Sequence, residues 1–182
     1  MSILMLRLRL NNGGHNSLGR ALCYQRQHER PQFTPLYSSA PLVLALTWIP
    51  RQGSTADAVR GVAERRLQEP ARFDQLFTEI GHLAREGVNA LTLGHLDELG
   101  ELLNQNHAHL HALGVTTDEL NALCRELRHR GALGAKMSGA GHGGVCLGLF
   151  EDLLAARKAV THLNTPHWIT TVKPRLHPTD IA

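Results

Sequence analysis

An almost continuous apolar run occupies residues 41–49, which read PLVLALTWI, and Pro50 follows it. Its length and its flanking prolines favour a strand, and a strand without polar alternation is typically buried on both faces. Such a strand needs other elements packed against both of its sides. The run therefore predicts a layered domain that is built around one central strand.

Four stretches with helical spacing follow this run. We expect the first helix to end at Gln68, near Pro70, and the next two to cover residues 72–89 and 93–113. The fourth ends at about Arg130, before a glycine. The candidate N-caps of the first and fourth helices are hydroxyl residues that can accept hydrogen bonds from free first-turn amides: Ser54 or Thr55, and Thr116 or Thr117.

Shorter elements complete the chain. Apolar runs at residues 132–137 and 144–150 predict two strands, residues 151–163 a helix and residues 167–173 a last strand. Because strands and helices are intermixed, we expect an α+β fold with two layers and an antiparallel sheet, over residues 36–182. Residues 20–26 and the alternating residues 4–10 predict further strands, with a polar turn at residues 28–32.

Composition excludes several classes of protein. Apolar residues make up 42% of the 182-residue chain, which suffices for a core, and the net charge of +3 is too small to predict a nucleic-acid-binding face. Three distant cysteines, Cys23, Cys124 and Cys146, predict neither a disulfide framework nor a zinc site. No apolar run is long enough for a membrane span, and the period-two start differs from a helical transit peptide. We therefore expect a cytoplasmic protein.

The strongest chemical signal is the glycine-rich stretch at residues 134–148, GAKMSGAGHGGVCLG. Small residues allow positive φ and let successive backbone amides face one anion, which favours a phosphate group. Ser138 could add a hydroxyl donor and Lys136 a positive charge. The stretch has neither the Walker A spacing nor the βαβ context of a dinucleotide fingerprint. A tight glycine turn between two closely packed strands is the alternative.

Read with its neighbours, this stretch resembles the third conserved motif of the small-molecule kinases that include galactokinase, homoserine kinase, mevalonate kinase and phosphomevalonate kinase. Residues 99–123, with Asn104, Asn106 and His107 before Leu-Gly-Val-Thr, are most similar to the mevalonate kinase family, and residues 20–36 and 41–59 resemble the family's strands and helix start. His142 stands where a glycine is usual.

The resemblance implies a ferredoxin-like C-terminal kinase domain that uses ATP and Mg²⁺ to phosphorylate mevalonate in isoprenoid biosynthesis. It implies a nucleotide-binding loop made of Ser138, Gly139, Ala140, Gly141, His142, Gly143 and Gly144. Thr55 and Thr116 would lie near the substrate side.

The family's principal phosphate loop, Pro-x-x-x-Gly-x-Gly-Ser-Ser-Ala, does not occur in this sequence. The family's catalytic aspartate would fall near residues 13–19, where His15 and Asn16 stand and no acidic residue precedes Glu29. We therefore assign no catalytic residue or Mg²⁺ ligand to this chain. Residues 1–35 are interpreted as a remnant of the N-terminal kinase domain or a non-native start. We expect no activity without a complementary N-terminal chain, and an uncovered apolar face that favours that partner or a homodimer.

Other interpretations remain open at this point. His107 and His111 are four residues apart and could share a metal ion, although packing roles are more common for such pairs. A non-catalytic ligand-binding or interaction module with the same fold is the main rival function. A nucleic-acid-binding sheet is disfavoured because aromatic residues are only 4% of the chain.

Overall fold

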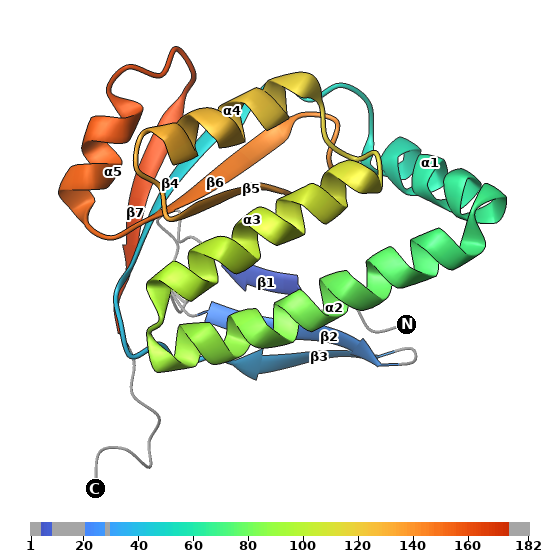
Figure 1. Cartoon of the computed structure of the whole chain (residues 1–182), viewed down its shortest axis with the longest axis horizontal. Helices are drawn as coiled ribbons and strands as arrows, with labels where there is room; N and C mark the ends of the chain where they lie inside the picture. Colours follow the sequence, from blue (N-terminus) through green and yellow to red (C-terminus); the bar gives the residue numbers. More distant parts are fainter. Residues whose placement is uncertain (1–4, 9–20, 28–29, 175–182) are drawn as a thin grey trace, which may run out of the picture.

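The computed structural model describes residues 5–8, 21–27 and 30–174 of the chain. Its main sheet has four antiparallel strands in the order β5-β6-β4-β7: Gly134–Ser138, Gly144–Phe150, Leu42–Ile49 and His167–Val172 (Figure 1). Counted along the chain within this sheet, the strands are β4, β5, β6 and β7, and the second and third of them, β5 and β6, form a hairpin. The first strand lies between the third and the fourth, which is the ferredoxin-like arrangement. The predicted α+β fold is confirmed.

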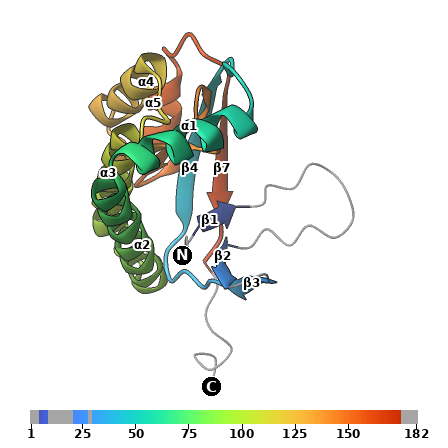
Figure 2. The same cartoon turned by 90° about the vertical axis from the view of Figure 1, so that its right-hand side faces the viewer.

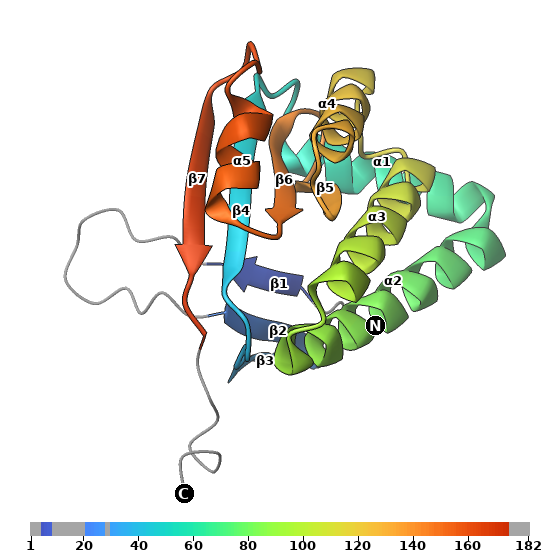
Figure 3. The ribbon, with the colours of Figure 1, turned by 60° about the vertical axis from the view of Figure 1, so that its left-hand side comes forward.

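Helices fill the two crossovers of this sheet. Between β4 and β5 lie α1 (Thr55–Gln68), α2 (Pro70–Leu93), α3 (Leu96–Ala112) and α4 (Asp118–His129), and α5 (Leu153–Val160) connects β6 to β7. Figure 3 shows α2 and α3 lying beyond the β5 edge of the sheet. None of these five described helices has the length and apolar content that a membrane span requires.

The helix boundaries follow local chemistry. Helix α2 is longer than predicted, because Pro70 starts the helix in its first turn and Gly94 ends it in a left-handed conformation with φ of 75°. The caps are Ser54 and Thr117, one residue from each predicted pair. The hydroxyl of Thr55 instead accepts a hydrogen bond from Arg51, and that of Thr116 pairs with His111.

Strand β4 is buried on both faces over its first half, as its sequence predicted. Val43 and Ala45 join a cluster with α4 and α5, while Leu42 and Leu44 join a second cluster with α2 and α3. In Figure 2, α3, α4 and α5 lie on one side of β4 and β7. Further along β4, Leu46 pairs with Trp168 of β7, which is 62% exposed. The face that carries Leu44 and Leu46 is therefore covered at one end and open at the other, within the described residues.

The N-terminal strands form a separate sheet. Its order is β1-β2-β3, with bounds Met5–Leu8, Ala21–Gln27 and Arg30–Pro35. The strands predicted from the alternation at residues 4–10 and from residues 20–26 are both present. Strand β3 begins at Arg30, inside the range predicted as a turn (residues 28–32), and residues 28–29 lie outside the described part.

Candidate functional site

Two polar side chains of α3 fix the strand that leads into the glycine-rich loop. Strand β5 is an edge of the main sheet, so alternate amides point away from β6. The Ala135 amide donates to Asn104 Oδ1 at 2.9 Å, and the Met137 amide donates to His107 Nδ1 at 3.3 Å. Helix α3 thus satisfies the strand edge that another strand would otherwise have covered. The Asn-x-x-His spacing places both side chains on one face of the helix, as the predicted packing role of His107 requires.

Close backbone contact accompanies these hydrogen bonds. A Cβ atom added to Gly134 would lie 2.0 Å from the Gly100 carbonyl oxygen, and one added to Gly100 would lie 2.5 Å from the Leu133 carbonyl oxygen. Helix α3 and β5 therefore approach each other at a distance that only two glycines permit. This contact and the two hydrogen bonds hold β5 rigidly up to Ser138.

The loop from Ser138 to Gly144 contains five residues with positive φ, and these values range from 56° to 105°. His142 has the smallest φ, 56°, and the other four residues are Gly139, Gly141, Gly143 and Gly144. Glycine adopts this conformation at no steric cost, whereas the histidine tolerates it at roughly 1–2 kcal/mol. His142 therefore keeps the backbone conformation that a glycine would have there.

The centre of the loop is held by backbone contacts with two distant segments. The His142 amide donates to the Val115 carbonyl at 2.9 Å, and the His142 carbonyl accepts from the Gln52 amide at 2.6 Å. A Cβ added to Gly141 would lie 2.0 Å from the Val115 oxygen, and one added to Gly143 would lie 2.4 Å from the Pro50 oxygen. The close approach falls on the glycines that flank His142, so the imidazole does not disturb it.

Four amides of the loop have no hydrogen-bond partner among the described residues. They belong to Gly139, Ala140, Gly141 and Gly143. Gly141 and Gly143 are buried, and buried backbone donors without a partner are rare in proteins. Gly139 is exposed, and a Cβ added there would meet nothing within 4 Å. The loop therefore offers donors without an internal partner, and the exposed Gly139 among them borders open space, which suits an anion.

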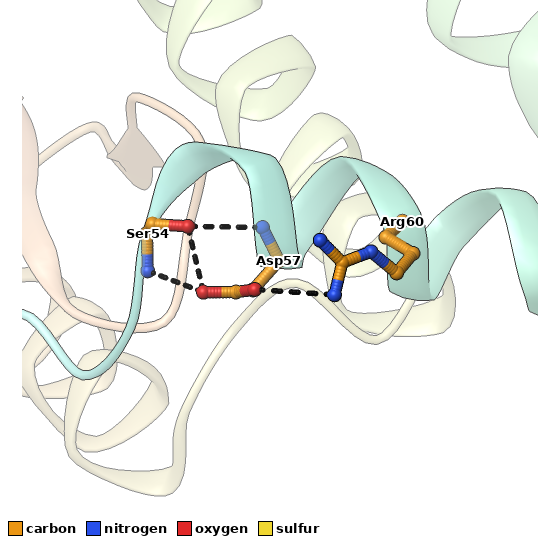
Figure 4. Close-up of polar contacts among 3 residues, drawn as sticks. All are labelled: Ser54, Asp57 and Arg60. Atoms are coloured by element: carbon orange, nitrogen blue, oxygen red, sulfur yellow. Dashed lines mark hydrogen bonds and ion pairs between the residues drawn. The ribbon is translucent and has the colours of Figure 1, made fainter.

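Each of the two helices that begin beside the loop carries acidic side chains in its own first turn. At the start of α1, the Ser54 hydroxyl and amide both donate to Asp57 Oδ2, at 2.6 and 3.0 Å, and Arg60 lies 3.6 Å from Oδ1 (Figure 4). The hydrogen bond from the Ser54 hydroxyl is the main reason that the pKa of Asp57 is lowered. The carboxylate of Asp57 already faces the positive end of this helix.

Helix α4 is capped in the same way. The Thr117 hydroxyl accepts from the Leu120 amide at 3.2 Å, and Asp118 and Glu119 stand in the first turn. A hydrogen bond from its own backbone and a second from Thr117 lower the pKa of the Glu119 carboxyl. Both helix starts therefore have carboxylates of their own, whereas the loop amides of Gly139, Ala140, Gly141 and Gly143 have no partner among the described residues.

Lys136 is separated from α4 by the sheet. It lies on β5 opposite Leu147 of β6, on the face that turns away from the buried Ala135 and Met137. Burial lowers the pKa of Lys136 to about 8. Ser138, two residues further on the same face, is exposed at the start of the loop.

Sequence reasoning identified the loop but not the segments that hold it. Residues 50–52 and Val115 contact it through backbone atoms, so their side-chain types carry no signal. No cluster of three His, Cys, Asp or Glu side chains in the described ranges is arranged for a metal ion. His107 is buried against Met137, while His111 pairs with Thr116 and Asn121, so these two histidines do not share a ligand site. His15 and Asn16 lie outside the described residues.

Comparisons with known proteins agree with this architecture. Residues 84–166 match the family model described as GHMP kinases C terminal. A mevalonate kinase of Methanothermobacter thermautotrophicus is 33% identical over 117 residues, which are 62% of this chain and 39% of that protein. One of Thermococcus gammatolerans is 36% identical over 132 residues, 69% of this chain and 39% of that protein. The matched region thus spans about two fifths of these relatives.

Solved structures show the same likeness. The crystal structure of L. major mevalonate kinase in complex with R-mevalonate has a TM-score of 0.79 and 31% identity, over 86% of this chain and 50% of that chain. Methanococcus jannaschii mevalonate kinase, with 22% identity and a TM-score of 0.65, shares the fold.

These matches and the ferredoxin-like topology point to one class: residues 84–166 match the GHMP kinase C-terminal model, and the fold is that of the matched kinases. Within that class, the relatives and the solved structure that the chain matches at 31–36% identity are mevalonate kinases, in agreement with the resemblance of residues 99–123.

Proposed function

We propose that this chain forms the C-terminal half of an ATP-dependent mevalonate kinase and that the loop at residues 138–144 binds the nucleotide phosphates. The four unpaired loop amides carry this proposal. ATP would supply the phosphoryl group, and Mg²⁺ would offset its charge. The similarity to mevalonate kinases supports mevalonate as the acceptor and isoprenoid biosynthesis as the pathway.

The loop is suited to an anion for two reasons. Its amides are held in position before a ligand arrives, because Val115 and Gln52 fix His142 at the centre of the loop. Preorganised donors cost little reorganisation when charge develops nearby. Ser138 and Lys136 would add a hydroxyl and a positive charge on the strand that leads into the loop.

The other parts of the site would come from an N-terminal kinase half, supplied by further sequence or by a second polypeptide. The described residues hold no carboxylate cluster for Mg²⁺, and this sequence lacks the serine-rich phosphate loop of the family. We assign residues 36–182 to the C-terminal kinase domain and residues 1–35 to the remainder of the N-terminal one. The open sheet face with Trp48 and Trp168, 42% and 62% exposed, would meet that half or a second copy.

Binding of Mg²⁺–ATP by the 182-residue chain tests the role of the loop. The Gly139→Ala variant adds a Cβ where φ is 105° and nothing lies within 4 Å, and Gly131→Ala does the same at φ of 92° outside the loop. Both variants carry similar backbone strain. Calorimetry should show binding about tenfold weaker for Gly139→Ala, the equivalent of one hydrogen bond to a charged group, and little change for Gly131→Ala. Equal losses in both variants would refute the phosphate role of the loop.

Turnover tests the kinase assignment. The 182-residue chain alone should not phosphorylate mevalonate to a measurable extent, and co-expression with an N-terminal half from a related mevalonate kinase should restore ATP-dependent phosphorylation. Robust activity of the chain alone would contradict the proposal. Nucleotide binding without any restored turnover would favour a non-catalytic ligand-binding module instead.

A further inference from the structure

Two buried cysteines meet beneath α4, away from the open face of the sheet. Cys124 lies on α4 and Cys146 on β6, and both side chains are fully buried. Their Sγ atoms are 2.7 Å apart. A disulfide bond of about 2.0 Å therefore requires only a small movement of the two side chains.

We propose that Cys124 and Cys146 are a disulfide-forming pair that links α4 covalently to the sheet in the presence of a small-molecule disulfide oxidant such as glutathione disulfide. This assignment goes beyond the phosphate-binding role and does not depend on it. No local sequence pattern indicates the pair, because 21 residues and a whole hairpin strand separate the two cysteines in the chain.

The surroundings give the two thiols different roles. The hydrogen bond from the Cys146 thiol lowers the pKa of Cys124, and His107, whose Nδ1 lies 3.9 Å from the Cys124 sulfur, contributes less. The same hydrogen bond and burial raise the pKa of Cys146. Cys124 is therefore the better nucleophile, and Cys146 is the thiol that resolves the intermediate.

The reaction is a thiol–disulfide exchange in two steps. The Cys124 thiolate attacks one sulfur of glutathione disulfide, an S–S bond forms between them, and one glutathione thiolate leaves. Cys146 then loses its proton and attacks the Cys124 sulfur, which releases the second glutathione thiolate. The two protein thiols lose two electrons, and the oxidant becomes two glutathione molecules that take up the two protons.

The bridge would close a covalent ring that contains β5 and the entire glycine-rich loop. Residues 124–146 span the end of α4, the edge strand and residues 138–144. Closing a loop reduces the freedom of the unfolded chain, so oxidation should stabilise the folded protein. Access of the oxidant to the buried pair requires local opening of α4, or exposure of the pair during folding.

Refolding in a glutathione redox buffer gives the oxidant access to both thiols. A Cys23→Ser background removes the third cysteine. After quenching and digestion with trypsin, peptides 86–125 and 137–157 should appear joined, with the loss of two hydrogens. The denaturation midpoint should be higher for the oxidised form than for the reduced form.

Cys146→Ala in the same background is the matched control. It should give a glutathione adduct or a free thiol at Cys124, and its midpoint should not increase on oxidation. The proposal is overturned if the refolded Cys23→Ser chain keeps both thiols free, or carries only glutathione adducts, in a buffer that oxidises a reference dithiol. That result would show that the two cysteines only pack in the core. Because the peptide mapping is done on the Cys23→Ser chain, it gives an answer even if the Cys146→Ala variant does not fold.

Discussion

The outward-facing backbone amides of strand β5 have hydrogen-bond partners, whereas four amides of the loop that follows it have none among the described residues. Along β5, the outward amides of Ala135 and Met137 are bound by Asn104 and His107, although no strand lies on that side in the main sheet. A few residues later, the amides of Gly139, Ala140, Gly141 and Gly143 have no partner in the described part of the chain. The domain can satisfy exposed backbone with side chains of α3, yet it leaves these loop donors free. This difference distinguishes the scaffold from the proposed phosphate-binding site.

The largest loss of stability should come from a substitution at the closest contact between α3 and β5. Gly134→Ala places a Cβ 2.0 Å from the Gly100 carbonyl oxygen, a clash between backbone segments that cannot rotate away. We expect a loss of about 3 kcal/mol or more in the free energy of unfolding. Gly87→Ala in α2 is the control, because its Cβ meets Leu99 at an ordinary 3.7 Å, and it should stabilise the protein by roughly 0.5–1 kcal/mol. Urea denaturation measures both, and equal effects would contradict the α3–β5 contact.

Removal of one edge acceptor should have a smaller effect. Asn104→Ala leaves the buried Ala135 amide without its partner, and an unsatisfied buried donor costs about 1–3 kcal/mol. Gln105→Ala changes an exposed neighbour on the same helix and should stay within about 0.5 kcal/mol. If Asn104→Ala were as mild as Gln105→Ala, the edge of β5 would not depend on α3.

A variant of the α1 cap tests whether the anion binds at the start of this helix or at the glycine-rich loop. Ser54→Ala removes the hydroxyl that binds the Asp57 amide and carboxylate, and it should reduce stability by about 1 kcal/mol. Because Asp57 would still occupy the helix start, affinity for Mg²⁺–ATP should remain within the error of calorimetry. A large change in nucleotide affinity would place the anion at α1 and not at the loop.

The last test is a pH dependence of the free energy of unfolding at Lys136. Burial lowers its pKa from 10.5 to about 8, so the unfolded chain holds this proton more tightly than the folded one. The burial penalty is fully present below about pH 8 and is relieved as the pH rises towards 10.5, which makes folding more favourable across that window. The stability of the wild type relative to Lys136→Met should therefore increase from pH 8 to pH 10.5, and a flat or falling difference would contradict the assignment.

The periodicity of apolar residues, together with the prolines, glycines and cap residues that end the elements, was sufficient to predict most of the fold. The apolar run at residues 41–49 became a strand buried on both faces over its first half, and the helices fell close to their predicted ranges because prolines, glycines and caps mark them. The hydroxyl caps were harder to place, since Ser54 and Thr55, or Thr116 and Thr117, differ by one residue and only the backbone geometry selects between them.

The site was less accessible to sequence reasoning. The glycines at residues 139–144 predicted positive φ and close backbone approach, and the structure shows both. The partners of the loop, Val115 and residues 50–52, act through backbone atoms and leave no residue-type signal. The proximity of Cys124 to Cys146 depends on how α4 lies across β6, which no local pattern encodes.

Amide NMR of the 182-residue chain during titration with Mg²⁺–ATP tests the central claim most directly. The resonances of Gly139, Ala140, Gly141 and Gly143 should shift and saturate, while those of Ala135 and Met137, which are already bonded to α3, should stay in place. Shifts that spare the loop, or no saturable shift in any of the four loop amides, would show that these donors do not receive a phosphate.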